Sequence, residues 1–540
     1  MSLFTESEHL LLDSFVTNCD TDVFCLYNLP EVIKGALFSR YSRSNKSLRR
    51  ILLDEFILTT EVSLVDKEDR ARDYLVSIKK AAEFYDRVLI GYGDDSVAEL
   101  GGAHIACENI SNIAAKALED SRLGISPLEK STRYVPFNRK INGYYQYYRE
   151  PSIMASSYSQ LYEKTLDNLF DTYTKLLNPL IARLRGCTVR DDDTSERAYN
   201  SAINAKALDL LRGLLPMATL TNVGLFGNGR AFEYLLVKLN ASPHGELKSL
   251  SQHMQRELDI VIPSFVKRAK TDKGNKYAQY LSRNHKNTEL LTQKLLGNIQ
   301  VTSFPLTTLQ AKPIVQLVEY DPQAEIKVVA AILYPHSKLN FEQMQAYVAG
   351  LEESERLTII KTYVGERESR VHRPGRAFEE VYYTFDILAD IGAYRDLQRH
   401  RILTQERQRF SISHGYSIPL ELIDTDLAYP YKQSLESAAE TAELIAKDLP
   451  DASEYVVPFA YLVQWRIKLN LREAYHLIEL RSNCQGHPSY RTIAQQMYQQ
   501  IQACHFSLAA PMKFVDINDY TLERLPSEKR IDIKLRQQNQ

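Results

Sequence analysis

Apolar residues recur at helical spacing along most of the chain, so the pattern predicts a protein dominated by helices. Helices are expected over residues 152–185, 205–215, 231–239, 247–270, 340–353, 435–447 and 471–480. Two more are expected over 97–118 and 376–404, each just before a basic stretch. In the second, the residues at helical intervals are Phe378, Val381, Phe385 and Leu388. The β-branched and aromatic run 314–320 predicts a strand, and the apolar run 326–334 suits either a helix or a strand.

Two polar segments predict where ordered structure is interrupted. Residues 271–311 are rich in lysine and have no clear period, so they predict a linker between two halves of the chain. The polar C-terminal tail from Leu525 is expected to fray. The remaining elements predict an α+β fold in which helices predominate.

Landmarks of the first half recur in the second half in the same order. Residues 96–99 match 376–379, and 132–134 match 408–410, with offsets of 379 − 99 = 280 and 409 − 133 = 276. Pro216 and Pro458 are each followed twelve residues later by an asparagine, and the offset is 458 − 216 = 242. Because the order is kept while the offset drifts, we infer an internal duplication, with a period too long for a solenoid. The predicted domains are residues 1–300, including an N-terminal helical extension, and residues 312–540.

Composition excludes several classes of protein. Lys plus Arg number 66 against 68 for Asp plus Glu, and the net charge of −2 gives no general attraction to nucleic acid or to a membrane. The six cysteines have no metal-ligand spacing, as expected for buried thiols in a reducing compartment. No apolar run approaches the length of a membrane span, and the N-terminus does not resemble a signal peptide. The sequence therefore predicts a soluble, cytoplasmic protein that binds neither nucleic acid nor membrane.

The stretch 399–410 contains four arginines and a histidine, and it is the strongest chemical signal in the chain. Alone, such a cluster is typical of a solvated helix end. Arginine is also the side chain that binds phosphate or carboxylate through a two-pronged contact. The chain has no GxSxG, HExxH or Walker motif. The residues therefore indicate binding of phosphorylated, planar ligands, with the chemistry supplied by a bound cofactor.

The same residues resemble the flavin-dependent thymidylate synthases. That family's signature reads Arg-His-Arg, seven residues, Ser, one residue, Arg and Tyr, and it is divided here between the two halves. The second half has Arg399, His400 and Arg401, and the first has Glu129, Ser131, Arg133 and Tyr134. The family's Asn-x-Arg element occurs twice, at Asn228 and Arg230 and at Asn470 and Arg472. The resemblance implies two tandem copies of a helix-rich domain that form an internal pseudo-dimer.

In that family the nucleotide lies between two subunits, so the resemblance implies a composite site between the two halves. The dUMP contacts would be Glu129, Lys130, Ser131, Thr132, Arg133, Arg212, Arg399 and Arg481. Of these, Ser131, Arg399 and Arg481 would act on the reacting base. The FAD contacts would be Arg399, His400, Arg401, Asn470, Arg472, His476, Asn228, Arg230 and Ser96, and no metal site is implied.

The reciprocal composite site would need arginines at Glu454 and Leu239 and a serine at Arg407. Its losses are therefore concentrated in one site, and we expect one complete dUMP site and one decayed site. Two positions also depart from the family's folate side, where the expected histidine is Asp94 in the first half and Pro374 in the second.

The resemblance implies reductive methylation of dUMP to dTMP, with FAD as cofactor and methylenetetrahydrofolate and NADPH as co-substrates. A homodimer of this chain would imitate that family's tetramer. Two alternatives remain: a flavin- or nucleotide-binding paralogue without catalysis, and a helical interaction protein. The single residues also have structural alternatives, since Ser131 could be a turn hydroxyl, Asn228 and Asn470 helix caps, and His400 and His476 a helix-end and a core histidine.

Overall fold

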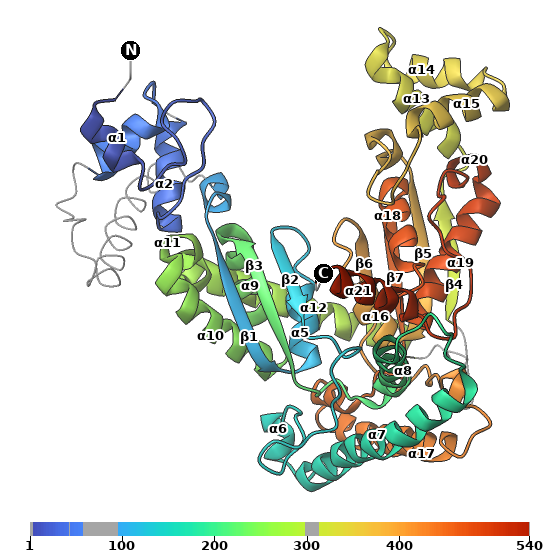
Figure 1. Cartoon of the computed structure of the whole chain (residues 1–540). Coiled ribbons are helices and arrows are strands. Elements are labelled where there is room, and N and C mark those ends of the chain that lie inside the picture. Colours follow the sequence, from blue (N-terminus) through green and yellow to red (C-terminus); the bar gives the residue numbers. More distant parts are fainter. Residues whose placement is uncertain (1–3, 43, 58–94, 298–312, 539–540) are drawn as a thin grey trace. The chain divides into compact units, whose positions relative to one another are not determined.

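The fold is described from a computed structural model that covers residues 4–42, 44–57, 95–297 and 313–538. The chain divides into two compact units (Figure 1), which we describe one at a time. The first unit comprises Met1–Glu108, Ala117–Glu129 and Asn222–Ile299, and the second comprises Asn109–Lys116, Lys130–Thr221 and Gln300–Gln540. The compact units therefore divide the chain differently from the predicted domains 1–300 and 312–540. The boundary between the duplicated copies stays a prediction.

The first unit is built on a three-stranded sheet with the order β1-β3-β2. Its strands are β1 (Gly102–Ile110), β2 (Ile125–Glu129) and β3 (Thr221–Asn228), with α5 (Asn112–Glu119) following β1. A Cβ atom at Gly102 would lie 2.4 Å from the carbonyl oxygen of Gly227, so this close approach of β1 to β3 requires glycine. The helix expected over 97–118 is therefore wrong in its first part, because backbone pairing replaces the helix there.

The helices of the first unit surround this sheet and form a separate N-terminal cluster (Figure 1). They are α1 (Glu6–Leu12), α2 (Glu31–Tyr41), α3 (Leu48–Ile51), η1 (Leu52–Ile57), η2 (Asp95–Glu99), α9 (Gly229–Asn240), α10 (Gly245–Val261), α11 (Pro263–Val266), η4 (Lys267–Lys270) and α12 (Asp272–Leu296). Helix α12 corrects the expected linker over 271–311. Its polar composition belongs to a helix that buries only Gly274 and Ala278. Residues 298–312 lie outside the described ranges.

The second unit contains a four-stranded antiparallel sheet with the order β4-β5-β7-β6. Its strands are β4 (Ile314–Tyr320), β5 (Tyr382–Asp390), β6 (Thr404–Arg407) and β7 (Leu462–Asn470), so the strand expected over 314–320 is confirmed. The helix expected over 376–404 is wrong, since Phe385 and Leu388 lie in β5. This strand pairs with both neighbours and buries residues on both faces, so its apolar run matches helical spacing by coincidence.

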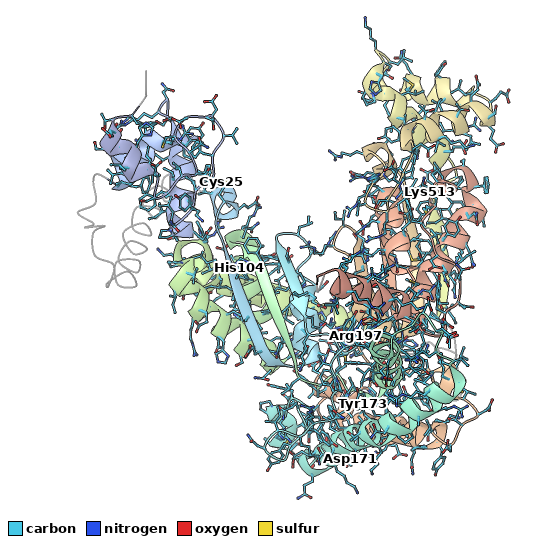
Figure 2. The ribbon with its side chains drawn as sticks, viewed as in Figure 1. Cys25, His104, Asp171, Tyr173, Arg197 and Lys513 are labelled. Atoms are coloured by element: carbon cyan, nitrogen blue, oxygen red, sulfur yellow. The ribbon has the colours of Figure 1, made fainter. Side chains whose placement is uncertain are left out.

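The helices of the second unit cover this sheet and extend from it. They are α6 (Pro151–Met154), α7 (Ser159–Cys187), α8 (Glu196–Leu211), η3 (Arg212–Leu214), α13 (Ala324–Leu333), η5 (Tyr334–His336), α14 (Phe341–Ala349), α15 (Glu353–Val364), η6 (Arg376–Glu379), α16 (Ile391–Leu397), η7 (Leu420–Leu422), α17 (Ala428–Ala446), η8 (Ala452–Val456), α18 (Leu471–Arg481), α19 (Pro488–Cys504), α20 (Phe506–Ala509) and α21 (Leu525–Gln538). Helices α7, α8, α13, α14, α17 and α18 overlap the expected ranges, whereas α15, α19 and α20 were not expected. Helix α21 corrects the expected frayed tail, because it packs on α8 through the Arg197 side chain (Figures 1 and 2).

Matched segments of the two halves face each other within the second unit. Pro216 and Pro458, the landmarks at an offset of 242, form an antiparallel bridge. The amide of Met217 donates to the carbonyl of Val457, and the amide of Phe459 donates to the carbonyl of Leu215, both at 2.9 Å. Each bond is the other's equivalent, because 217 + 242 = 459 and 215 + 242 = 457. Reciprocal contacts of this kind are the mark of a two-fold interface, here between two halves of one chain.

The longest helices of the two halves reinforce this arrangement. Helices α7 and α17 pack along each other (Figure 1), with hydroxyl bonds from Thr165 to Thr441 at 2.8 Å and from Thr172 to Ser434 at 2.7 Å. Both pairs are buried, so these polar groups satisfy each other inside the interface. None of the described helices contains a stretch long and apolar enough to span a membrane.

Candidate functional site

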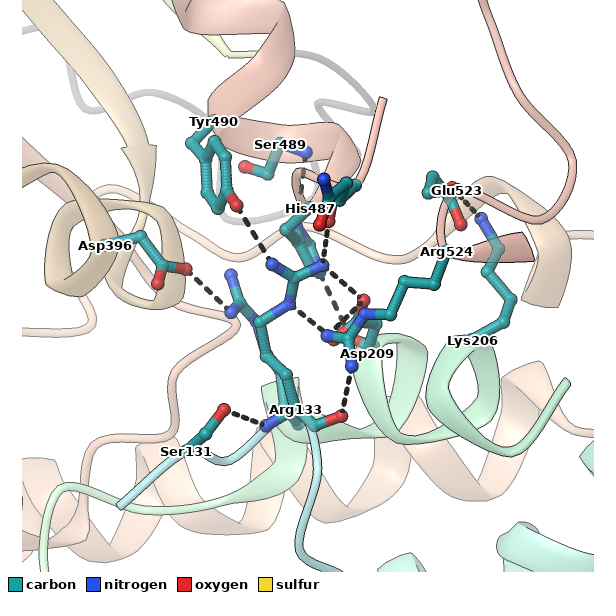
Figure 3. A network of polar contacts seen from close by, with 12 residues as sticks. Ser131, Arg133, Lys206, Asp209, Asp396, His487, Ser489, Tyr490, Glu523 and Arg524 are labelled. Atoms are coloured by element: carbon teal, nitrogen blue, oxygen red, sulfur yellow. Dashed lines mark hydrogen bonds and ion pairs between the residues drawn. The ribbon is translucent and has the colours of Figure 1, made fainter. Parts of the chain in front are cut away.

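Arg133 is held in the loop after β2 by contacts from three separate segments (Figure 3). Its Nε and Nη2 atoms donate to the two carboxylate oxygens of Asp209 on α8, at 2.9 and 2.8 Å. Nη1 donates to the Tyr490 hydroxyl at 2.9 Å and Nη2 to the carbonyl of Gln485 at 3.1 Å. The Ser131 hydroxyl accepts the backbone amide of Arg133 at 3.2 Å, which is the turn geometry that the structural alternative expected.

Arg212 follows α8 by one residue and points toward two carboxylates. Nη1 donates to Oδ2 of Asp396 at 2.9 Å, and Nη2 lies 4.0 Å from Oδ1 of Asp390. The Arg212 side chain is 4% exposed, and Nη2 has no hydrogen-bond partner among the described residues. The Asp390 carboxylate has other hydrogen-bond partners. It caps α16 by accepting the amide of Ala393, and it accepts the Ser489 hydroxyl. One arm of Arg212 is therefore available to a ligand.

The carboxylate of Asp396 is where the predicted arginines converge. Burial alone would raise the pKa of Asp396, but Arg212, Arg133, Arg399 and Arg481 together hold it well below the ordinary value. Arg212 contacts this carboxylate directly, and the charges of Arg133, Arg399 and Arg481 act on it from further away. Lys130 is exposed and lies over the Phe137 ring at 5.2 Å, and Thr132 is buried.

The cluster has more positive than negative charge. Arg133, Arg212, Arg399 and Arg481, with Arg524 at 3.4 Å from Asp209, provide five guanidinium groups. Asp209 and Asp396 both have pKa values far below the ordinary range, so both are ionised and these groups sum to 5 − 2 = +3. Burial raises the pKa of the neighbouring Asp390, which reduces its share of negative charge. A mostly buried positive excess is costly unless an anion balances it, so this cluster suits an anion.

A cavity of about 550 Å³ adjoins the cluster. Arg212 is the only one of the predicted substrate residues that lines it, together with Asp209, Asp390 and His487. The volume falls in the range of pockets for nucleotide-sized ligands. Arg212 and Asp209 therefore belong both to the cavity wall and to the arginine cluster.

Arg481 is oriented by a buried chain of polar groups. Its Nε donates to Nε2 of His400 at 2.9 Å, and Nδ1 of His400 lies 2.9 Å from the Glu473 carboxyl group. Because arginine can only donate, Nε2 accepts and Nδ1 carries the proton that is donated to Glu473. Burial, reinforced by Arg481, lowers the pKa of His400 well below its ordinary value, so the imidazole is neutral. A neutral His400 thus fixes the direction of Arg481 without adding charge.

Among the described residues, one group of side chains is arranged so that it could bind a metal ion, and it consists of His400, Glu473 and His476. Each offers a ligand atom, all within 4.8 Å of one another. Both ring nitrogens of His400 already have partners, and three arginines lie near His476. Burial and these arginines lower the pKa of His476 to about 4. The arrangement therefore favours an anion near His476 over a cation.

Glu473 gives a pH prediction. Burial raises its pKa from 4.5 to about 7, so folding favours the protonated carboxyl group. This contribution is complete below pH 4.5 and is lost as pH rises to about 7, which costs about 3 kcal/mol of stability. Glu473→Gln imitates the protonated form and should remove this part of the pH dependence. Urea unfolding at pH 5 and pH 8 measures it, and equal pH dependence in both proteins would contradict the assignment.

The predicted flavin contacts of the second half have mixed surroundings. Asn470 caps α18, since its Oδ1 accepts the amide of Glu473 at 2.8 Å, and the structural alternative holds for this atom. Its Nδ2 has no hydrogen-bond partner among the described residues. Arg472 donates to the carbonyl of Pro374 at 2.8 Å and to Glu379 at 3.1 Å. The Arg401 side chain is half-buried.

Four predicted residues belong to the first unit and are described there alone. Asn228 caps α9 through the amide of Ala231 at 2.8 Å, as the structural alternative expected. Arg230 pairs with Glu99 at 2.8 Å, and both side chains are about half exposed. Glu129 is buried at the end of β2, and Ser96 lies in η2. Asp94 lies outside the described residues.

The positions of the expected decayed site are filled by structural contacts. Glu454 is buried and accepts the amide of Phe410 at 3.3 Å. Arg407, where the family has serine, places its guanidinium over the Phe410 ring at 3.8 Å. A buried carboxylate in the place of an arginine opposes anion binding at this location.

Sequence reasoning missed the acidic partners of the arginines, namely Asp209, Asp396 and Glu473, and the residues Tyr490, His487 and Arg524. Two of the acids had a signal in the sequence. Asp209 precedes Arg212, and Asp396 precedes Arg399, by three residues in each case. Asp-x-x-Arg at the end of a helix places the two side chains on one face.

Comparisons with known proteins agree with the duplication. The chain matches the family described as thymidylate synthase complementing protein over residues 50–264 and again over 316–505. It is 44% identical over 527 residues to a UPF0159 protein of Chlamydia pneumoniae, which covers 98% of each chain. It is 32% identical over 528 residues to a UPF0159 protein of Thermoplasma acidophilum, covering 93% of this chain and 99% of that protein.

Among solved structures, the chain is similar to a UMP/dUMP methylase, PolB, from Streptomyces cacaoi bound with 5-Br dUMP. The sequence identity is 18% and the TM-score is 0.29, and the match covers 38% of this chain and 96% of that one.

Proposed function

Since this chain belongs to the thymidylate synthase complementing protein family, as a tandem duplicate of its domain, we propose that it catalyses the reductive methylation of dUMP to dTMP. Methylenetetrahydrofolate and NADPH would be the co-substrates and FAD the cofactor. The observation that carries the proposal is the convergence of Arg133, Arg212, Arg399 and Arg481 on Asp396. These arginines come from both halves of the sequence, as a composite dUMP site requires.

The charges support a nucleoside monophosphate as the ligand. The positive excess at the cluster suits the negative charge of a phosphate group. Arg212 would bind the phosphate through its unpartnered Nη2, next to Arg133. Arg481, held by neutral His400, and Arg399 would stabilise negative charge that develops on the uracil ring. Ser131 would orient the base.

The residues near His476 fit the diphosphate of FAD in charge. Arg373, Arg370 and Arg481 all act on this histidine, and the Nδ2 group of Asn470 is free to donate to a ligand. The chain would hold FAD through Arg399, His400, Arg401, Asn470, Arg472 and His476 of the second unit. Asn228, Arg230 and Ser96 stay contacts that the resemblance implies. Bound reduced flavin would supply the electrons and mediate the one-carbon transfer. A homodimer of the chain would imitate the tetramer of single-domain relatives.

An absorbance spectrum tests the cofactor. The protein purified after addition of FAD is expected to show flavin bands, because the cationic, half-buried surroundings of His476 favour a diphosphate. The control is Arg373→Gln, which removes one of these cations and should weaken FAD retention. A spectrum without flavin bands in the wild type would count against the cofactor.

Tritium release from dUMP labelled at the 5-position tests the reaction. We expect release only when FAD, NADPH and methylenetetrahydrofolate are all present. No release from a protein that binds dUMP would instead support a flavin- or nucleotide-binding protein without catalysis. One observation favours that second candidate, since four hydrogen bonds already occupy the Arg133 guanidinium.

A further inference from the structure

The C-terminal segment is anchored to α8 by ion pairs along its length. Arg197 contacts Glu528 at 2.9 Å and also binds Asp532, which in turn accepts the hydroxyl of Ser195 at the start of α8. Lys529 pairs with Asp193 at 2.9 Å. The segment lies beyond residue 505, where the match to the family ends. It therefore lies outside the matched ranges, and it follows α8 from its first residue toward the arginine cluster.

The segment enters the cluster at two consecutive residues, Glu523 and Arg524, both almost completely buried (Figure 3). Glu523 accepts Nζ of Lys206 at 2.6 Å. Arg524 lies 3.4 Å from both carboxylate oxygens of Asp209. Lys206 and Asp209 are one helical turn apart on α8, so the two contacts fix the height and rotation of the segment on that helix.

Arg524 also contacts the loop that carries Arg133. Its Nη1 donates to the carbonyl oxygen of Arg133 at 2.9 Å, and its guanidinium lies over the Tyr134 ring at 4.1 Å. Asp209 is therefore shared by two arginines, Arg133 and Arg524. A second cation on Asp209 reduces the hold of this carboxylate on Arg133 and leaves more of the Arg133 charge for an anion.

We propose that Arg524 is a positioning residue of the anion site, which the C-terminal segment inserts so that Arg133 can bind the nucleotide phosphate. The role rests on the proposed function, because it presumes that the cluster binds dUMP. Arg524 acts through Arg133 and Asp209, so its loss should affect ligands that carry a phosphate and spare those that do not.

The test compares dUMP with deoxyuridine by calorimetry in the full-length wild type and in Arg524→Gln. We expect the Kd for dUMP to rise about tenfold in the variant, as loss of a charged contact predicts, while the Kd for deoxyuridine stays unchanged. Arg524→Lys keeps the charge and should restore part of the dUMP affinity, which a purely structural role would not predict. If Arg524→Gln fails to fold, the wild type is compared with Arg524→Lys. We then expect the Kd for dUMP to rise less than tenfold and the Kd for deoxyuridine to stay unchanged.

The matched control is Arg530→Gln on α21, the helix that follows Arg524. In the hydrogen bonds of the described residues, the Arg530 side chain contacts only Ser527. It should change neither Kd. The positioning role is overturned if the ratio of the Kd for dUMP to the Kd for deoxyuridine is the same in Arg524→Gln, in Arg524→Lys and in the wild type. A wild type that binds neither ligand would instead overturn the proposed function, so the two failures are distinguishable.

Discussion

Arg212→Lys is expected to weaken dUMP binding about 100-fold while leaving deoxyuridine binding nearly unchanged. Arg212 uses Nη1 for Asp396 and has a buried Nη2 without a partner. Lysine has one compact ammonium group, which can satisfy Asp396 but cannot reach a phosphate from a second nitrogen at the same time. The lost contact between Nη2 and the phosphate amounts to about 3 kcal/mol.

Calorimetry with both ligands measures this effect, and thermal unfolding shows whether the variant is intact. The matched control is Arg149→Lys, which changes a partly exposed pair with Glu163 outside the site. It should alter neither affinity. Equal losses for dUMP and deoxyuridine in Arg212→Lys would contradict a phosphate role for Arg212.

Asp209→Asn is expected to destabilise the protein by about 3–5 kcal/mol, because it leaves two buried arginines without their shared counter-charge. Asp209 binds Arg133 through both oxygens and lies 3.4 Å from Arg524. The positive excess of the cluster then increases by one, so an anion should stabilise the variant more than it stabilises the wild type. Urea unfolding with and without dUMP measures both effects.

Glu163→Gln is the control for this experiment. It also removes a carboxylate from an arginine, but both side chains of the pair are about one-third exposed, so the loss should stay below about 1 kcal/mol. The prediction is contradicted if dUMP stabilises Asp209→Asn no more than it stabilises the wild type.

The arginines of the site could be predicted from the sequence because their spacing survives in both halves. Arg133, Arg212, Arg399 and Arg481 were each identified from a motif or from the resemblance, and the charges of all four lower the pKa of Asp396. The duplication was predicted from landmarks such as Pro216 and Pro458, which form a bridge across the two halves. Motifs of this kind are carried by local sequence and need no knowledge of packing.

The remaining features depend on contacts between distant segments. Strand β5 was predicted to be a helix because its burial on both faces hides the alternation of a strand. The tail from Leu525 was predicted to fray because its sequence is rich in charged residues. In the structure these residues pair with Arg197 on α8 and with Ser195, which caps that helix. The acids were missed for the same reason, since only the fold brings Asp209 to Arg133.

The two proposed composite sites have different contacts at their predicted positions. At the arginine cluster, acids hold the guanidinium groups in place and leave a positive excess. At the other location, Glu454 accepts a backbone amide and Arg407 covers Phe410, so both side chains serve packing. Duplication of the domain within one chain allows such divergence, because each half needs to retain only its own contribution to one site.

A calorimetric titration of the wild-type chain with dUMP tests the central claim most directly. The account predicts one molecule of dUMP bound per chain, because the reciprocal positions include the buried carboxylate of Glu454, which opposes anion binding. Two molecules per chain, or none at any concentration tried, would contradict it.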